Sequence, residues 1–500
     1  MQFNSIHFLI FFPVVLAVYF VIPKKLRYIW LLITSYYFYM SWNAKYAVLI
    51  AFSTVVTYLT AILIDQFALD ENKTNKLMQK ITLFIGIASN LAILFMFKYL
   101  NFATDNICAL LSSFGITVAE RQFDLLLPVG ISFYTFQALG YVIDVYRKNI
   151  NAEYNLFRYA LFVSFFPQLV AGPIERSANL ITQLRNTHKI NLWNYERIVK
   201  GFMIMIWGFF MKVVIADRAA TVVNYIFDNY YALNSSALIL GSVFFALQIY
   251  CDFASYSTIA IGASQIMGFS LMDNFNTPYF AMSIKEFWRR WHISLSSWFK
   301  DYLYIPLGGN RKGTVRKYIN LMIVFLVSGL WHGADWTYVV WGGLHGAYQI
   351  IGDITKPVKT KIEKKLKFNT DASSYKLIKV LITFALTCFA WIFFRADSIE
   401  LAFSYIGRMF TSLDPWAWTT GILYSLSLSR QEMNILLIST FALLYVDYMK
   451  RKKNIRFENI ADKQNFWVRG LIIFVLIFVV VIFGAYGYNF DAQQFIYFQF

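Results

Sequence analysis

The chain has 500 residues, of which 58% are hydrophobic and 19% aromatic, and its formal net charge at pH 7 is +17. This composition excludes an ordinary soluble globular protein. Apolar runs recur without a long soluble insert, so we expect one integral-membrane domain over residues 1–500 in contact with a lipid bilayer. The Lys and Arg residues lie in short loops between apolar runs, which favours the cytoplasmic bias of basic loops over nucleic-acid binding.

Neither the cysteines nor the histidines form a recognisable metal or disulfide pattern. Cys108, Cys251 and Cys388 are far apart and embedded in apolar sequence, so a disulfide framework is not expected. The five histidines lack the short regular intervals of a zinc motif. The sequence therefore predicts no metal site.

The N-terminal part of the chain reads as a series of membrane spans. Apolar runs, each close to the ~20 residues that a helix needs to cross the hydrocarbon layer, occur at 6–22, 28–42, 46–64 and 81–98. Residues 1–20 have no basic segment and no cleavage site, which indicates a retained first span. Basic residues follow the first and third runs, which places these loops in the cytoplasm and the N-terminus outside.

The next segments contain helix-breaking residues. The 126–145 run begins with Pro128 and Gly130, which is typical of a re-entrant or broken helix. Whether 157–176 crosses the membrane stays open, and a span is expected at 198–216. The 236–269 run contains Asp252, which is costly in hydrocarbon unless it faces a cavity or a partner. A helix-to-helix hydrogen bond and a catalytic role are equally open for Asp252.

The segment from 273 to 317 carries eight Lys or Arg and three acidic residues, with Trp and Tyr between them. This pattern predicts helices that lie at the cytoplasmic interface. The runs 318–331 and 336–352 then form a predicted hairpin with His332 at its turn. Further spans are expected at 376–394, 433–448 and 467–487.

About eleven transmembrane helices, with re-entrant and interfacial helices besides, are consistent with all the loop charges. The fold class is therefore an all-α polytopic membrane protein. The basic block at 450–453 is placed inside, and the aromatic tail 489–500 is placed outside. No matching inverted halves are visible, which argues against a secondary transporter.

His332 is the principal candidate for catalysis. Gly329 and Gly333 flank Trp331 and His332 and leave room for a backbone or a narrow ligand. An ionisable side chain at membrane depth is a functional-site candidate, although an imidazole that only packs within the bundle is equally open. Neither a phosphate-binding glycine motif nor a nucleophile elbow is present. The remaining chemistry is a histidine general base that deprotonates an acceptor hydroxyl.

Several long motifs resemble the membrane-bound O-acyltransferase family, in its bacterial branch of alginate O-acetylation and D-alanyl-lipoteichoic acid transfer proteins. The motifs cover 128–133, 167–176, 248–262, 286–311, 330–345 and 391–395. The resemblance implies a ring of helices around a thin centre with a central tunnel. It implies that His332 is catalytic and that His292 is a second functional histidine. The branch usually has a second carboxylate in the Asp252 motif and Asn at Asp335, so this chain departs from the pattern at both places.

The expected function is O-acylation of an extracellular glycan, a polysaccharide or a cell-wall polymer, with an acyl group passed across the bacterial cytoplasmic membrane. The acyl group would be acetyl from the cytoplasmic thioester acetyl-CoA, with no bound cofactor. Arg289, Arg290 and Arg311 would attract the donor phosphates, or would serve topology alone. Asp252, Trp331 and Asp335 would support the tunnel. D-alanyl transfer to teichoic acid is the alternative within the enzyme class, and a polysaccharide or lipid export component is the alternative outside it.

The terminal aromatic motif of this branch contains a tyrosine, which Tyr497 matches. By the resemblance, Tyr497 carries the acyl group to an extracellular partner transferase of the SGNH, serine-hydrolase-like type. A phenol is a poor nucleophile unaided, so this role requires His332 as its base. An interfacial anchor is the plain alternative for the tail.

Overall fold

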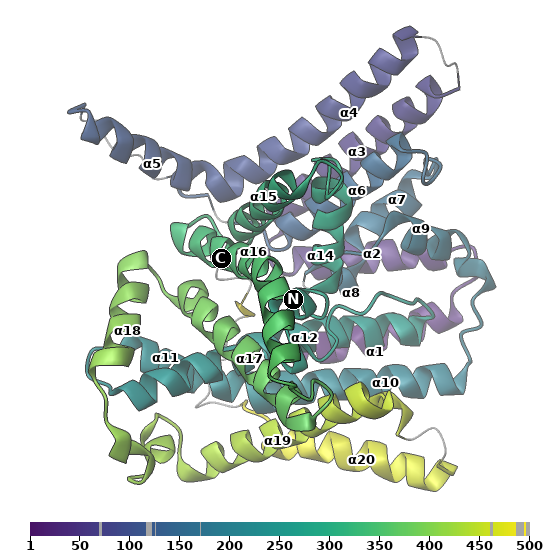
Figure 1. Cartoon of the computed structure of the whole chain (residues 1–500). Helices are drawn as coiled ribbons and strands as arrows, with labels where there is room; N and C mark the ends of the chain where they lie inside the picture. Colours follow the sequence, from purple (N-terminus) through teal and green to yellow (C-terminus); the bar gives the residue numbers. More distant parts are fainter. Residues whose placement is uncertain are drawn as a thin grey trace. The chain divides into compact units, whose positions relative to one another are not determined.

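The computed structural model describes residues 1–69, 73–116, 123–125, 127–170, 172–460, 464–486 and 495–496. Helices and the loops between them make up these residues, which include no strand (Figure 1). The all-α prediction is confirmed. The α-helices are α1 (Ile6–Val21), α2 (Arg27–Met40), α3 (Ala47–Phe67), α4 (Lys73–Leu94), α5 (Leu100–Ser113), α6 (Ile131–Tyr146), α7 (Leu156–Ser164), α8 (Phe166–Leu169), α9 (Ser177–Arg185), α10 (Tyr195–Phe209), α11 (Asp217–Asp228), α12 (Ser235–Met267), α13 (Ile284–Trp288), α14 (Ile293–Phe299), α15 (Thr314–His332), α16 (Trp336–Lys365), α17 (Ser373–Arg395), α18 (Ile399–Thr411), α19 (Arg430–Lys453) and α20 (Phe466–Phe483). The π-helical segments are η2 (Phe95–Tyr99), η4 (Phe210–Ala216) and η6 (Lys300–Tyr304). The 3-10 segments are η1 (Ala44–Tyr46), η3 (Thr187–Lys189), η5 (Pro278–Phe280), η7 (Pro415–Trp418), η8 (Ile422–Ser425) and η9 (Phe457–Asn459).

Eight helical stretches of the described chain are long and apolar enough to cross a membrane, compared with about eleven crossings expected from the sequence. They are Ala44–Phe67, Lys73–Ser113, Tyr195–Asp228, Ser235–Met267, Thr314–His332, Ser373–Arg395, Arg430–Lys453 and Phe466–Phe483. The predicted spans at 6–22 and 28–42 became helices of 16 and 14 residues, shorter than the ~20 residues of a full crossing. The 30-residue helix α16 is not among these stretches. Its second half is rich in charged residues, which lowers its mean hydropathy.

The chain divides into two compact units. The N-terminal unit comprises residues 1–201 and 260–272, and the C-terminal unit comprises 202–259 and 273–500. Both candidate histidines belong to the C-terminal unit, so the site can be described within one unit.

The helix-breaking segments of the N-terminal unit fold as short or buried helices. Gly130 adopts a positive φ of 74° immediately before α6, and a Cβ there would lie 2.6 Å from the carbonyl oxygen of Leu169. Only glycine fits such a close approach in that conformation. The 157–176 run, for which a crossing was left open, folds into α7 and α8 of nine and four residues. Neither helix is long enough to cross.

The C-terminal unit contains the predicted hairpin, which is confirmed: α15 and α16 lie side by side (Figure 1). A Cβ on Gly329 would lie 2.3 Å from the carbonyl oxygen of Tyr338, and a Cβ on Gly342 would lie 2.3 Å from that of Phe325. Small residues thus let the two backbones touch. His332 is the last residue of α15 and stands at the turn.

Candidate active site

Two histidines that are forty positions apart in the chain lie close together. The ring centroids of His292 and His332 are 6.3 Å apart, and the two residues are 0% and 2% exposed. His292 precedes α14 with a positive φ of 42°, which is costly for a residue other than glycine and persists only where the surroundings hold it. Backbone hydrogen bonds fix the chain on both sides, from Asn276 to the carbonyl of Arg290 at 2.9 Å and from Ile293 to that of Asn274 at 3.0 Å.

Aromatic rings surround both imidazoles. His332 meets Trp341 and Trp331 edge-on, with ring centroids at 4.9 and 5.0 Å. His292 meets Phe253 edge-on at 4.6 Å. Burial lowers the pKa of His292 to about 3, because desolvation disfavours the charged imidazolium. His292 is therefore neutral at physiological pH, and a neutral imidazole can accept as well as donate a proton.

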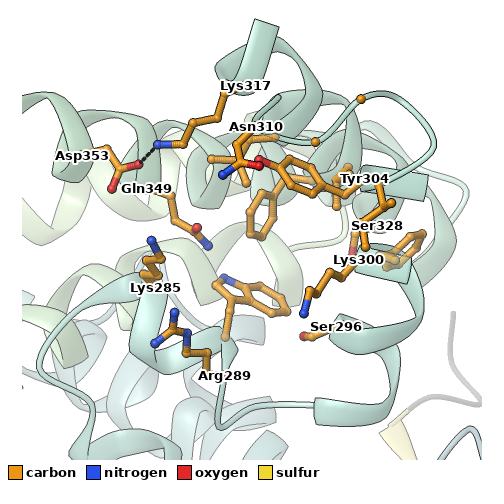
Figure 2. Close-up of a pocket in the computed structure, with 18 of the residues that line it drawn as sticks. Lys285, Arg289, Ser296, Lys300, Tyr304, Asn310, Lys317, Ser328, Gln349 and Asp353 are labelled. Carbon is orange, nitrogen blue, oxygen red and sulfur yellow. Dashed lines mark hydrogen bonds and ion pairs between the residues drawn. The ribbon is translucent and has the colours of Figure 1, made fainter. Parts of the chain in front are cut away.

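A cavity of about 600 Å³ lies among residues of α13, α14, η6, α15, α16 and the loop after η6 (Figure 2). Five of its lining residues are basic, namely Lys285, Arg289, Lys300, Arg311 and Lys317. The acidic lining residue Asp353 forms an ion pair with Lys317 at 2.5 Å. The remaining positive charge favours an anionic ligand, because a concave site lined by one sign of charge concentrates the opposite sign.

Neither His292 nor His332 lines the cavity, but a residue one helical turn from each of them does. Ser296 lines it four residues after His292, and Ser328 lines it four residues before His332 on the same helix. The N–H of Ser296 donates to the carbonyl of His292 at 3.0 Å, as in a helical turn. A ligand in the cavity would therefore contact residues that lie one helical turn from each histidine.

Aromatic side chains form the inner wall of the cavity. Trp288 lines the cavity, and its indole N–H donates to Nδ1 of His345 at 3.2 Å. Its ring packs on Trp341 at 5.7 Å, and Trp341 in turn packs on His332. One tryptophan ring thus connects the cavity wall to His332.

The structure separates the three predicted donor-binding arginines. Arg289 and Arg311 line the cavity. Arg290 is instead engaged by Glu286, four residues earlier, with nitrogen and oxygen 2.9 Å apart, and it donates to the carbonyl of Asn276 at 3.1 Å. The two residues directly follow α13, and consecutive side chains there point in different directions, so Arg289 faces the cavity and Arg290 faces Glu286.

The predicted supporting residues take different roles. Trp331 is buried and contacts both histidines, with centroids 5.0 Å from His332 and 5.9 Å from His292. Asp335 is the N-cap of α16 and accepts the N–H of Thr337 at 2.7 Å. Its carboxylate therefore satisfies a free helix donor.

Asp252 forms the helix-to-helix interaction that was one of its two open roles. It accepts a hydrogen bond from Nζ of Lys212 at 2.7 Å, and Lys212 pairs with Asp217 at 2.8 Å. Sequence reasoning missed Lys212, although a lysine inside the apolar 198–216 run is the kind of costly intramembrane charge that marks a partner.

The cavity is also lined by Lys285, Trp288, Lys300 and Lys317. The basic residues of the 285–317 segment were expected as a group to attract the donor phosphates, but none of these four was singled out as a site residue. Their spacing follows no motif, and the only signal was the general basic and aromatic character of the segment. Within the predicted tail 489–500, the structure describes Phe495 and Ile496. Tyr497 and the other tail residues lie outside the described residues. Among the described residues, no group of three or more His, Cys, Asp and Glu side chains could hold a metal ion.

Comparison with known proteins gives consistent matches. The model of the MBOAT, membrane-bound O-acyltransferase family matches residues 147–395. The chain is 37% identical over 448 residues to the probable alginate O-acetylase AlgI of Pseudomonas putida, across 89% of this chain and 86% of that protein. It is 36% identical over 405 residues to the peptidoglycan O-acetyltransferase of Helicobacter pylori, across 76% and 73%. It is 26% identical over 281 residues to the teichoic acid D-alanyltransferase of Bacillus subtilis, across 53% and 68%.

Proposed function

Because this chain belongs to the membrane-bound O-acyltransferase family, we propose that it takes an acetyl group from cytoplasmic acetyl-CoA and passes it across the membrane for O-acetylation of an extracellular glycan. Two similar proteins bear the names of an alginate O-acetylase and a peptidoglycan O-acetyltransferase, and both names denote O-acetylation. The bacterial cytoplasmic membrane is the proposed location, with both termini outside. The positions of the basic loops support this orientation.

The proposal rests on the basic cavity, whose lining includes a residue one helical turn from each of the two histidines. Five cations line it, and coenzyme A carries phosphates that such a site attracts. Bound by its phosphates, the donor would direct its thioester toward His292 and His332. The arrangement brings an anionic donor and a general base together in a site that aromatic rings shield from water.

The chemical step is an acyl transfer. His332 takes the proton of an acceptor hydroxyl, and the acceptor oxygen forms a bond to the acetyl carbonyl carbon. The carbon–sulfur bond of the thioester breaks, and the proton leaves with the thiol of coenzyme A. A neutral imidazole has one nitrogen that donates and one that accepts, and the ring centroid of His292 is 6.3 Å from that of His332.

Tyr497 is the proposed first acceptor. Its phenol would carry the acetyl group as an ester to an extracellular transferase of the SGNH type, which completes the transfer to the glycan. Burial of the adjacent Phe495 and Ile496, at 0% and 3% exposed, supports a tail that enters the protein interior rather than one that only anchors at the interface.

The test is acetyl-CoA turnover by the purified protein. We expect release of coenzyme A, together with an added acetyl group on the C-terminal peptide by mass spectrometry when the partner transferase is absent. Tyr497→Phe should abolish both the tail modification and glycan acetylation at unchanged protein levels. Movement of a glycan without consumption of acetyl-CoA would favour an export component. Consumption only of a D-alanyl-charged carrier protein would favour the activity named for the Bacillus subtilis protein.

A further inference from the structure

The π-helical segment η4 and the following turn receive the end of the last helix. The guanidinium of Arg218 donates to the carbonyl of Phe483, the last residue of α20, at 2.6 Å. The N–H of Ala485 donates to the carbonyl of Val213 at 2.7 Å. Extra carbonyls are available here because a π-helical stretch breaks the regular hydrogen-bond ladder, and such stretches often occur at functional sites.

Ile496, eleven residues after Ala485, also contacts a residue that is bound to η4. The N–H of Ile496 donates to Oδ2 of Asp252 at 2.8 Å, while Oδ1 of the same carboxylate accepts from Lys212 at 2.7 Å. Lys212 is 1% exposed, and Asp252 is 2% exposed. Lys212 and Asp252 thus form a buried ion pair, and a charge-assisted hydrogen bond is about twice as strong as a neutral one.

Apolar contacts add to this hydrogen bond. The ring of Phe495 packs on Tyr256 with centroids 4.3 Å apart and on Phe253 at 5.9 Å. Phe253 also contacts His292 at 4.6 Å. One phenylalanine ring therefore separates the anchored tail residue from a candidate catalytic histidine.

We propose that Asp252, held by Lys212, is a positioning residue that anchors the C-terminal tail through the backbone N–H of Ile496. The carboxylate accepts a hydrogen bond from a backbone N–H, which any tail residue except proline could donate. Phe495 packs beside Tyr256 and thereby fixes Ile496 as the residue that donates it. The anchor limits where Tyr497 can lie, because consecutive Cα atoms are only ~3.8 Å apart. The anchoring itself does not depend on the proposed acyl transfer. Its consequence, delivery of Tyr497 to the histidines, rests on the proposed function.

Thiol labelling of Ile496→Cys tests the anchor without any acyl transfer. Cys108 is changed to Ser, and the reaction of residue 496 with a charged maleimide is followed by peptide mass spectrometry on the full-length protein in detergent. Labelling should be slow in this parent. After Asp252→Ala it should be about tenfold faster or more, because the variant loses a hydrogen bond to a charged group, and that bond stabilises the unreactive, bound tail.

Asp447→Ala is the matched control. Asp447 is also a buried carboxylate of the C-terminal unit, but it accepts the hydroxyl of Tyr250 at 2.9 Å instead of a tail group. Labelling should stay slow in this variant. Unchanged labelling after Asp252→Ala, or an equal increase after Asp447→Ala, overturns the anchor.

A second pair of variants changes the tail instead of the core. Ile496→Pro removes the N–H that Asp252 accepts, whereas Ile496→Val keeps it. We expect the Pro variant to lose glycan acetylation with an unchanged KM for acetyl-CoA, and the Val variant to retain acetylation. Equal activity of the two variants overturns the delivery role. Fast labelling after Asp252→Ala together with undiminished acetylation leaves the anchor standing and counts against Tyr497 as the carrier.

Discussion

His332 combines the features of a general base with little exposure to water. It ends α15, is 2% exposed and is enclosed by Trp331 and Trp341. We expect such a side chain to contribute more to the reaction barrier than to the fold, because its aromatic neighbours Trp341 and Phe394 also pack on one another.

We expect His332→Ala to lower acetyl transfer by roughly 10²- to 10⁴-fold, the usual contribution of a positioned general base. Coenzyme A release and tail acetylation would both be measured, along with thermal stability in detergent. His188→Ala, at an exposed position of the N-terminal unit, is the control and should keep its activity. Activity of the His332 variant near that of the control would remove His332 from the chemical step.

His292 differs because burial lowers its pKa to about 3. An exposed histidine of the unfolded chain titrates near ~6.5, so the unfolded state binds a proton at a higher pH than the folded state does. Above pH ~6.5 both states are neutral and nothing is lost. As the pH falls from there toward 3, protonation favours the unfolded state.

The unfolding temperature should therefore fall between pH 6.5 and 5 by more in the parent protein than in His292→Gln, which cannot titrate. Thermal unfolding in detergent at several pH values measures this difference. Equal slopes would show that His292 is solvated. We also expect His292→Gln to keep more activity than His292→Lys, because only the latter places a charge among buried rings.

The α15–α16 hairpin positions His332 through glycine contacts. Gly329 lies one turn before His332, where a Cβ would meet the carbonyl oxygen of Tyr338 at 2.3 Å. Backbone cannot yield as a flexible side chain can, so any side chain there must push the helices apart.

Gly329→Ala should destabilise the protein by about 1–3 kcal/mol, the usual cost of overpacking, and should lower the rate of acetyl transfer by displacing His332. Gly343→Ala, on the same hairpin, is the control, since its Cβ would find only a side-chain carbon of Leu326 at 3.6 Å. Thermal unfolding and coenzyme A release are the two measurements. A Gly329 variant as stable and active as the Gly343 variant would contradict the close packing.

The cavity helices make a separate prediction about the donor. Replacing Lys285, Arg289 and Arg311 together by Gln should raise the KM for acetyl-CoA by about tenfold, since each partly solvated charge contributes up to ~1 kcal/mol, with a smaller effect on kcat. The effect should shrink at high salt. Arg290→Gln is the control, because Arg290 pairs with Glu286. An unchanged KM in the triple variant would leave the basic residues with topology alone.

The proposed orientation of the whole chain rests on its basic loops, and its apolar surface is that of a membrane protein. Residues of α20 such as Phe474 and Val481 are 62% and 56% exposed, as expected for a helix that faces lipid. We expect Lys452→Cys, at the end of α19, to react with an impermeant maleimide only after the cells are opened. Asn4→Cys should react in intact cells. The reverse pattern would invert the proposed topology, and Cys108 is changed to Ser in both variants.

Local pattern determined a large part of this protein. Runs of apolar residues predicted helices at membrane depth, glycines and the turn around His332 predicted the hairpin, and long motifs identified the family, which the comparisons confirm. These features depend on residues close together in the chain, so the sequence shows them directly.

Tertiary structure decided which distant residues meet. The pairing of His292 with His332, of Lys212 with Asp252, and of Asp252 with Ile496 joins positions 40, 40 and 244 residues apart. The sequence also left open which arginine faces the cavity. Arg289 and Arg290 are adjacent in the chain, and only the folded backbone after α13 gives their side chains different directions. The hydropathy and charge of apolar helices do not depend on which helices are neighbours. Which face of each helix contacts which neighbour is decided only when the side chains interdigitate in the folded protein.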